Sequence, residues 1–140
     1  MRIEIEIPLK EEVLQVGENV RVAPNGESWS GKQLGEHARD SGVYIIHHGG
    51  SIKYVGQAFG LSFAERLRRE FHERAALGGH IYPKLAKLTV PPEIKVTLFP
   101  LSKVGELVTA REGKLDNRGR AAIFEQAMIH AYRPEFQIQE

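Results

Sequence analysis

Hydrophobic residues alternate with polar residues at several points along the chain, which is the pattern of half-buried β-strands. Residues 2–7 are the clearest example, and Pro8 ends that run. Four later stretches with strand-like patterns lie at residues 19–22, 43–48, 52–57 and 93–101. Two of these stretches are separated by Gly49-Gly50, a spacing that is typical of a β-hairpin. The pattern therefore predicts a β-sheet that includes one hairpin.

Apolar residues at helical spacing predict a helix at about residues 63–77. Ser62 and Glu65 form a capping box at its start, because the serine can cap the first turn and the glutamate can reach back to it. Gly78-Gly79 ends the helix. Arg66 lies beside the buried stripe, at the rim from which a side chain can enter a cleft. The stripe repeats every four residues and consists of Phe63, Leu67 and Phe71.

The other helical signals are shorter or weaker. A last helix is expected at about residues 120–132, and Pro134 ends it. Residues 32–39 show a weak helical pattern, and residues 80–87 form a plausible short helix. Residues 103–118 favour neither a helix nor a strand.

The hairpin turn decides whether Tyr44 and Tyr54 share a face of the sheet. Side chains alternate between the two faces, so a two-residue loop separates the two tyrosines. A three-residue or bulged turn brings both to one face, and the glycine pair permits such a turn. If the tyrosines cooperate, the turn must be of this second kind. His47-His48, which precede the turn, are expected to be exposed to solvent.

A chain of 140 residues is long enough to form one domain with its own core. We interpret residues 1–40 as an N-terminal elaboration and residues 41–140 as the main domain of a single compact unit. Hydrophobic residues make up 41% and charged residues 26%, which is ordinary globular composition. No apolar run approaches the length of a membrane span, and we expect a cytoplasmic protein. Because the chain has no cysteine, a metal would need oxygen or imidazole ligands.

The net charge of +1 hides a local asymmetry. Basic residues crowd one stretch, whereas much of the acid lies in the first 40 residues. Attraction to phosphate depends on local charge more than on the total, so this stretch favours a nucleic-acid partner. Glutamates in the same stretch also fit a solvated helix of mixed charge, and both interpretations remain open. The basic residues are Arg66, Arg68, Arg69, Arg74, Lys84 and Lys87.

One carboxylate, Glu125, lies in the middle of an otherwise apolar face of the last expected helix. A charge in such a position is costly unless it meets an opposite charge or a metal ion. A buried ion pair with an arginine, Arg66 among the candidates, explains the position as well as a cation site does. The neighbours of Glu125 on that face are Ala121, Met128, Ile129 and Tyr132.

Two short strings mark the hairpin, Gly42-Val43-Tyr44 on one strand and Tyr54-Val55-Gly56 on the other. Arg66 follows on the next helix and Glu125 on the last. In this order and spacing the residues resemble the GIY-YIG endonuclease superfamily, and the likeness covers roughly residues 41–137. The resemblance implies an α+β fold with a small three-stranded antiparallel sheet flanked by helices. An N-terminal extension that contains a strand precedes it here.

The resemblance also implies the chemistry of the site. Glu125 would hold one divalent cation, Mg²⁺ or Mn²⁺, together with water and the substrate phosphate. Tyr44, Tyr54 and Arg66 would surround the scissile phosphate, with Tyr44 activating the attacking water and Tyr54 binding phosphate. His80 would contact phosphate or water. The residues expected to contact nucleic acid are Lys53, Arg69, Lys84 and Gln137.

Two positions depart from the superfamily pattern. Glu70 stands where many members have a histidine, and Gln137 stands where they have an asparagine. Glu70 can pair with Arg66 four residues before it, or it can lend a second acid to the site. Lys53 is expected to lower the pKa of a nearby tyrosine, because a neighbouring cation favours the ionised phenol.

The function that we expect is a divalent-metal-dependent endonuclease that hydrolyses phosphodiester bonds in DNA by direct attack of water. One alternative is a catalytically silent nucleic-acid-binding module with the same fold. Another is a protein-interaction module in which Glu125 forms only a salt bridge. DNA is the expected partner, with a homodimer or an accessory targeting protein as further possibilities.

Overall fold

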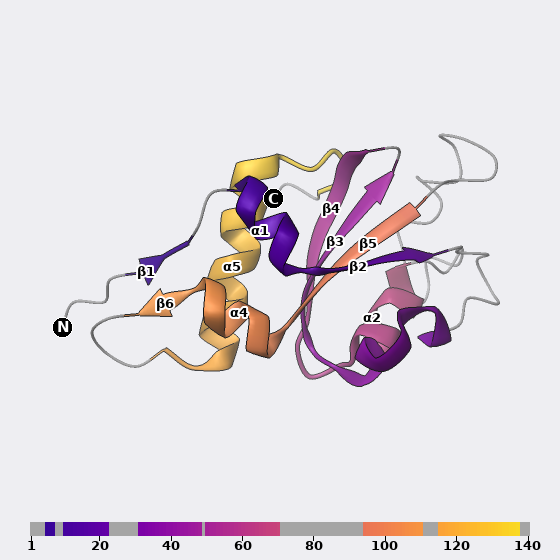
Figure 1. Cartoon of the computed structure of the whole chain (residues 1–140), viewed down its shortest axis with the longest axis horizontal. Coiled ribbons are helices and arrows are strands. Elements are labelled where there is room, and N and C mark those ends of the chain that lie inside the picture. Colours follow the sequence, from indigo (N-terminus) through magenta and orange to yellow (C-terminus); the bar gives the residue numbers. More distant parts are fainter. Residues whose placement is uncertain are drawn as a thin grey trace.

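A computed structural model describes residues 5–7, 10–22, 31–48, 50–70, 94–110 and 115–137, which form an α+β fold (Figure 1). Its centre is a four-stranded antiparallel sheet with the strand order β2-β5-β3-β4. A separate two-stranded ladder pairs β1 with β6. The strands are β1 (Ile5–Glu6), β2 (Glu18–Val22), β3 (Gly42–His48), β4 (Ser51–Ala58), β5 (Ile94–Pro100) and β6 (Thr109–Ala110).

Helices cover both faces of the central sheet, and each face has its own buried core. On one face, Tyr44, Ile46 and Leu98 pack against α2 and the 3₁₀ helix η2. On the other, Val43, Ile45 and Phe99 pack against α1, α4 and α5, with the Phe99 and Phe124 ring centroids 5.0 Å apart. The helices are α1 (Lys10–Val16), η2 (Gly31–Arg39), α2 (Phe63–Glu70), α4 (Leu101–Leu107) and α5 (Asn117–Tyr132).

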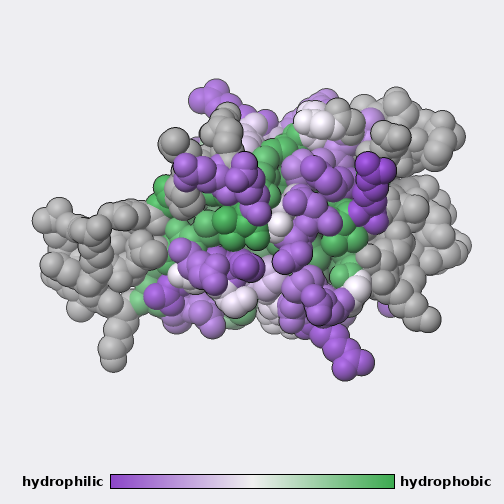
Figure 2. Space-filling model, viewed as in Figure 1, coloured by the Kyte–Doolittle hydropathy of each residue, from purple (hydrophilic) through white to green (hydrophobic). Residues whose placement is uncertain are grey.

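The elements with strong local patterns form as predicted. The hairpin of β3 and β4, the strand at 19–22 and the strand at 93–101 are confirmed within one or two residues. The last helix is also confirmed, and it starts three residues earlier than predicted. Figure 2 shows that, on the face of Figure 1, hydrophobic residues reach the surface in patches among hydrophilic ones. None of the described helices has both the length and the apolar character that crossing a membrane requires.

The sheet is wider than the three strands that the superfamily resemblance implied. β2, from the segment interpreted as an elaboration, pairs with β5 along its whole length, from Glu18 opposite Leu98 to Val22 opposite Ile94. β5 therefore has a neighbour on each side, and β2 forms an edge of the described sheet. The helix α4 was not predicted, and residues 109–110, within the ambiguous stretch, pair with β1. The predicted helix at 80–87 and residues 71–77 lie outside the described part of the chain.

The expectation that His47 is exposed is wrong, because its side chain is 5% exposed. His47 Nε2 donates a hydrogen bond to Thr97 Oγ1 (2.8 Å), and that hydroxyl donates to Asn19 Oδ1 (2.7 Å). These three residues, here called the His47 network, cross β3, β5 and β2. Burial lowers the pKa of His47 to about 4, and the nearby charge of Lys95 acts in the same direction. The imidazole is therefore neutral at neutral pH.

Candidate active site

A β-bulge brings the two hairpin tyrosines to one face of the sheet. Ile46 lies opposite Tyr54, whereas the next residue, His47, lies opposite Ile52, so Lys53 is the extra residue of β4. Without this bulge the ladder would place the tyrosines on opposite faces. The ring centroids of Tyr44 and Tyr54 lie 6.2 Å apart with a tilt of 40°. The expectation that cooperating tyrosines need a three-residue or bulged turn is wrong: the turn has two residues, with His48 opposite Ser51, and the extra residue lies within β4.

Each of the two strings contains a glycine at a position where a larger side chain would clash with neighbouring atoms. A Cβ atom on Gly56 would lie 2.5 Å from Tyr44 Oη and 2.8 Å from a ring carbon of Tyr54. A Cβ atom on Gly42 would lie 1.9 Å from the backbone oxygen of Phe99 on β5. Any larger residue at Gly56 would displace the phenol of Tyr44, and any larger residue at Gly42 would separate β3 from β5.

The helix α2 carries the arginine of the site, and its start is fixed by local bonds. Ser62 Oγ accepts from the Glu65 backbone N–H (3.2 Å), and Glu65 Oε1 accepts from the Ser62 backbone N–H (3.4 Å), which confirms the capping box. The Phe63 backbone N–H donates to the carbonyl of Asp40 (2.7 Å), so the helix is tied to the end of η2. Phe63 and Leu67 are fully buried against the sheet.

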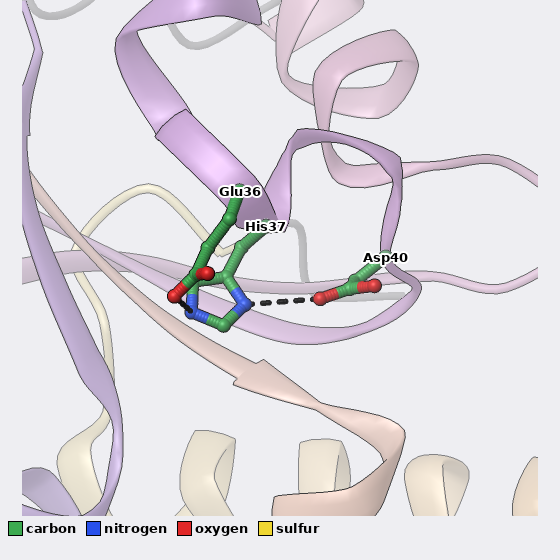
Figure 3. Close-up of polar contacts among 3 residues, drawn as sticks. All are labelled: Glu36, His37 and Asp40. Carbon is green, nitrogen blue, oxygen red and sulfur yellow. Dashed lines mark hydrogen bonds and ion pairs between the residues drawn. The ribbon is translucent and has the colours of Figure 1, made fainter.

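At the end of η2, a small polar cluster lies next to α2 (Figure 3). His37 Nδ1 is 2.9 Å from Asp40 Oδ2, and His37 Nε2 is 3.6 Å from Glu36 Oε1. Asp40 is the residue whose carbonyl accepts from α2. The polar groups of this cluster therefore bond to one another at the point where η2 is tied to α2.

Glu70 is fully buried and pairs with Arg66, one helical turn before it. Arg66 Nη2 lies 3.2 Å from Glu70 Oε1, and the arginine side chain keeps 32% of its surface exposed. Burial raises the pKa of Glu70 to about 7, although the charge of Arg66 and the nearby Tyr44 hydroxyl act in the opposite direction. The sequence left two roles open for Glu70, and the ion pair with Arg66 is the one that forms.

Several buried polar atoms meet here without hydrogen bonds. Tyr44 Oη, Arg66 Nε and both carboxylate oxygens of Glu70 are buried and have no hydrogen-bond partner in the described structure. Arg66 and Glu70 are close enough for their charges to act on the Tyr44 hydroxyl, but none of these contacts has hydrogen-bond geometry. We call Tyr44, Arg66 and Glu70 the α2 cluster. Each unmet group costs roughly 1–3 kcal/mol, so such a concentration calls for an explanation, such as a ligand or water that completes the bonding.

Both phenols are held in their neutral form. Burial, and then the charge of Glu70, raises the pKa of Tyr44 well above its usual value. The same causes raise the pKa of Tyr54 to about 12. The expectation that Lys53 lowers the pKa of a tyrosine is not met: the pKa of both phenols is raised, and the cation that opposes this rise is Arg66. Lys53 instead pairs with Glu135 and lies over the ring of Phe136, 5.6 Å from its centroid.

Glu125 comes from α5, on a different part of the chain, yet it belongs to the same electrostatic environment. Its negative charge raises the pKa of Tyr54, and the positive charge of Arg66 lowers the pKa of Glu125. Burial has the largest effect and raises the pKa of Glu125 overall. Among the described residues Glu125 forms no ion pair, and Arg66 pairs with Glu70 instead. A direct salt bridge between Arg66 and Glu125 therefore does not explain the position of this carboxylate.

The donor set at Glu125 fits one kind of metal ion. The described residues contain no group of three or more histidine, aspartate or glutamate side chains that could hold a metal. A dedicated protein cage is therefore not formed by this part of the chain. A single carboxylate suits Mg²⁺ or Mn²⁺, which keep several waters and share their coordination with substrate phosphates.

The C-terminal tail runs along the outer edge of β4, beside Tyr54. Gln137 Nε2 donates to the carbonyl of Val55 (3.0 Å), and Gln137 Oε1 accepts from the Val55 N–H (3.1 Å). The Phe136 N–H donates to the carbonyl of Lys53 (2.8 Å). The amide of Gln137 is thus committed to the backbone, as if it were one residue of a further strand. Contacts of Lys53 and Gln137 with nucleic acid stay predictions.

The remaining predicted site residues divide into two groups. Arg69 is exposed on α2, where its side chain reaches solvent, and its contact with nucleic acid stays a prediction. His80 and Lys84 lie outside the described residues. Sequence reasoning missed the burial of Glu70. Its spacing from Phe63 and Leu67, seven and three residues, is the signal that puts it on their buried face.

Comparison with protein-family models, with curated proteins and with solved structures finds no match.

Proposed function

We propose that the protein is a divalent-metal-dependent endonuclease that hydrolyses phosphodiester bonds in DNA by direct attack of water. The observation that carries this proposal is the convergence of Tyr44, Tyr54, Arg66 and Glu125. They come from β3, β4, α2 and α5, and their charges and hydroxyls act on one another's pKa values. Packing alone gives no reason for two phenols, a guanidinium and an acid to gather at one point.

Arg66 is the group best suited to bind the scissile phosphate. Its guanidinium is partly exposed, carries a permanent charge and offers a planar set of donors that matches phosphate oxygens. A donor fixed in a poorly solvated site stabilises charge that develops on the phosphorus centre more strongly than one in water. The neutral phenols add O–H donors to the same region.

The exposures favour Tyr54 over Tyr44 as the phenol that reaches substrate. Tyr44 is fully buried, whereas Tyr54 keeps 8% of its surface exposed. We therefore reverse the roles expected from the sequence. Tyr54 orients the attacking water or a phosphate oxygen, and the buried Tyr44 helps to position Arg66. Glu125 would hold Mg²⁺ or Mn²⁺, and the ion would supply charge neutralisation at the phosphoryl oxygens.

We further propose that the chain shares the GIY-YIG nuclease arrangement, with β2 as an added strand. The two glycine–tyrosine strings support this relation, because each glycine is required by a close approach. The bulge that pairs the tyrosines on one face supports it as well.

Cleavage of supercoiled plasmid tests the proposed activity. The wild type is expected to nick the plasmid with Mg²⁺ or Mn²⁺ and to be inactive in EDTA. Glu125→Ala is expected to lose at least about 100-fold in rate, the usual effect of removing one group that stabilises transition-state charge. Glu106→Ala is the matched control, because Glu106 is an exposed carboxylate on α4. Absence of cutting by the wild type with both ions would refute the enzyme assignment.

A second candidate is a nucleic-acid-binding module without catalysis, and one observation favours it. Arg66 is already paired with Glu70, and the Tyr44 hydroxyl is sealed from solvent. A gel-shift series over salt concentration, together with the plasmid assay, separates the two candidates. Binding with a steep salt slope but without cleavage would identify the silent module.

A further inference from the structure

In the ion pair of Arg66 and Glu70, the carboxylate is the buried partner and its surroundings are unusual. Glu70 is fully buried and its carboxylate oxygens have no hydrogen-bond donor, so Arg66 is the only cation paired with it among the described residues. Arg66 is the partner that faces solvent, and about a third of its side-chain surface is exposed. The guanidinium therefore faces a buried carboxylate on one side and the proposed phosphate site on the other.

We propose that Glu70 is the positioning residue of this site: its carboxylate holds the Arg66 guanidinium in place, and it takes up a proton when a phosphodiester becomes the partner of Arg66. This inference rests on the proposed function, because it requires a nucleic-acid phosphate at Arg66. It assigns to Glu70 a role in binding that acts through Arg66, without contact with substrate.

The physical reason is competition for one cation. A phosphodiester at Arg66 draws the guanidinium outward and adds a negative charge near the carboxylate. A buried carboxylate that loses its counter-ion is strongly disfavoured by desolvation, and protonation removes that penalty. In the free protein the Glu70 carboxylate is already close to protonation at neutral pH, since its pKa is about 7. Binding is therefore expected to raise that pKa and to consume a proton at neutral or higher pH.

The groups that face Glu70 fit this account. Tyr44 comes from β3 and Tyr54 from β4, and both phenols are neutral at neutral pH. Arg66 is on the same helix. The 3₁₀ helix η2 also packs on α2, and its His37 is bound to Asp40 and Glu36 (Figure 3). Its other charged residue among those whose side chains are described, Arg39, is exposed. None of these η2 groups contributes to the raised pKa of Glu70.

The first test measures binding of a short DNA duplex in EDTA, where no cleavage can occur. Calorimetry in two buffers of different ionisation enthalpy gives the number of protons taken up. We expect uptake to approach one proton per bound site at about pH 8 and to fall towards zero at about pH 6. Over the same range the affinity of the wild type is expected to weaken, approaching about tenfold per pH unit above pH 7.

Glu70→Gln is the decisive variant, because glutamine has the shape of the protonated acid and cannot titrate. We expect it to bind without proton uptake, with the same affinity as the wild type at about pH 6 and about tenfold more tightly at about pH 8. Glu106→Gln, an exposed site on α4, is the matched control and should behave as the wild type. A role of Glu70 limited to folding would not produce this pH-dependent difference.

Three results would overturn the inference in distinguishable ways. Binding by the wild type without proton uptake refutes the inference and leaves the proposed function standing. Uptake that persists in Glu70→Gln assigns the proton to another group, such as Glu125 or a histidine, and refutes the inference. Absence of any duplex binding refutes both proposals. If Glu70→Gln does not fold, the ¹³C carboxyl titration of Glu70 in the wild type decides instead, since its midpoint must rise when duplex is added.

Discussion

Two buried polar groups lie on opposite faces of the same sheet, and they differ in how far their hydrogen bonds are satisfied. The α2 cluster, under α2 and η2, has four buried polar atoms without a hydrogen-bond partner in the described structure. The His47 network, on the face covered by α1, α4 and α5, forms a continuous chain of hydrogen bonds at 2.8 and 2.7 Å. Tyr44 and Glu70 are buried in one group and His47 and Thr97 in the other, whereas Asn19 is exposed; the clearer difference between the groups is in their bonding.

This difference in hydrogen bonding separates a group that stabilises the fold from a group that is a candidate for function. A satisfied buried network joins strands and contributes to the free energy of unfolding. An unsatisfied one lowers stability, and a folded protein retains it where the unmet donors and acceptors serve a ligand. On this basis, changes in the His47 network should act on folding, and changes in the α2 cluster should act on binding and cleavage.

Each group lies against a glycine at which an added methyl group would clash with the group. Replacing these two glycines gives the largest expected effects. Gly56→Ala would drive a Cβ atom to 2.5 Å from Tyr44 Oη, and Gly17→Ala would drive one to 2.4 Å from Thr97 Cγ2. We expect each change to lower the free energy of unfolding by about 1–3 kcal/mol through overpacking. Only Gly56→Ala should also abolish plasmid cleavage at temperatures where the protein remains folded.

Gly105→Ala is the control for both changes, because Gly105 lies within the helix α4 and a Cβ atom added there would meet no other atom within 4 Å. It should raise stability by roughly 0.5–1 kcal/mol, as expected for removing a helical glycine. Urea unfolding measures all three. Cleavage by Gly56→Ala at the wild-type rate would show that the position of the Tyr44 phenol is unimportant.

Removing one hydroxyl from each group should have opposite consequences for stability. Thr97→Val takes the central hydroxyl from the His47 network and leaves the buried His47 Nε2–H without an acceptor, which should cost about 1–3 kcal/mol. Tyr44→Phe removes a hydroxyl that has no hydrogen-bond partner in the described structure, so the free energy of unfolding should stay the same or rise. The same change should slow cleavage. A loss of stability in Tyr44→Phe comparable to that in Thr97→Val would contradict the distinction between the groups.

The two groups should also respond to pH in opposite directions. The pKa of Glu70 is raised from 4.5 to about 7, so its contribution to stability is present below pH 4.5 and is lost as the pH rises through about 7. The pKa of His47 is lowered from 6.5 to about 4, so its contribution is present above pH 6.5 and is lost as the pH falls towards 4. Subtracting the unfolding profiles of Glu70→Gln and His47→Gln from that of the wild type isolates each contribution. Parallel profiles for wild type and variant would refute the corresponding assignment.

Local sequence signals predicted most of the fold, and the exceptions depend on distant contacts. The capping box of Ser62 and Glu65 and the glycine-linked hairpin of β3 and β4 depend on neighbouring residues, and they form as expected. The pairing of β2 with β5 joins segments far apart in the chain, which no local pattern specifies. The helix α4 follows Pro100 and contains Gly105, so its local signal is weak, and the burial of its apolar residues stabilises it.

The candidate site likewise combines features that the local sequence predicts with features that depend on distant contacts. The types and order of its residues were visible in the sequence, whereas their ionisation was not. The phenols of Tyr44 and Tyr54 have raised pKa values because of burial, and burial depends on the whole sheet and its covering helix. The full burial of Glu70 has the same origin. A residue pattern thus identified the candidate reactants, but the fold determines which of them carry charge.

The smallest expected effect concerns the tail, where a satisfied polar group lies next to the candidate site. Gln137→Ala removes two hydrogen bonds to Val55, the residue between Tyr54 and Gly56, and should cost about 1 kcal/mol of unfolding free energy. Because the amide is already bonded to the backbone, the salt dependence of DNA binding should not change. Gln15→Ala, at an exposed position on α1, is the control for stability. A shallower salt slope in Gln137→Ala would instead show that Gln137 helps to bind phosphate, as the superfamily resemblance implied.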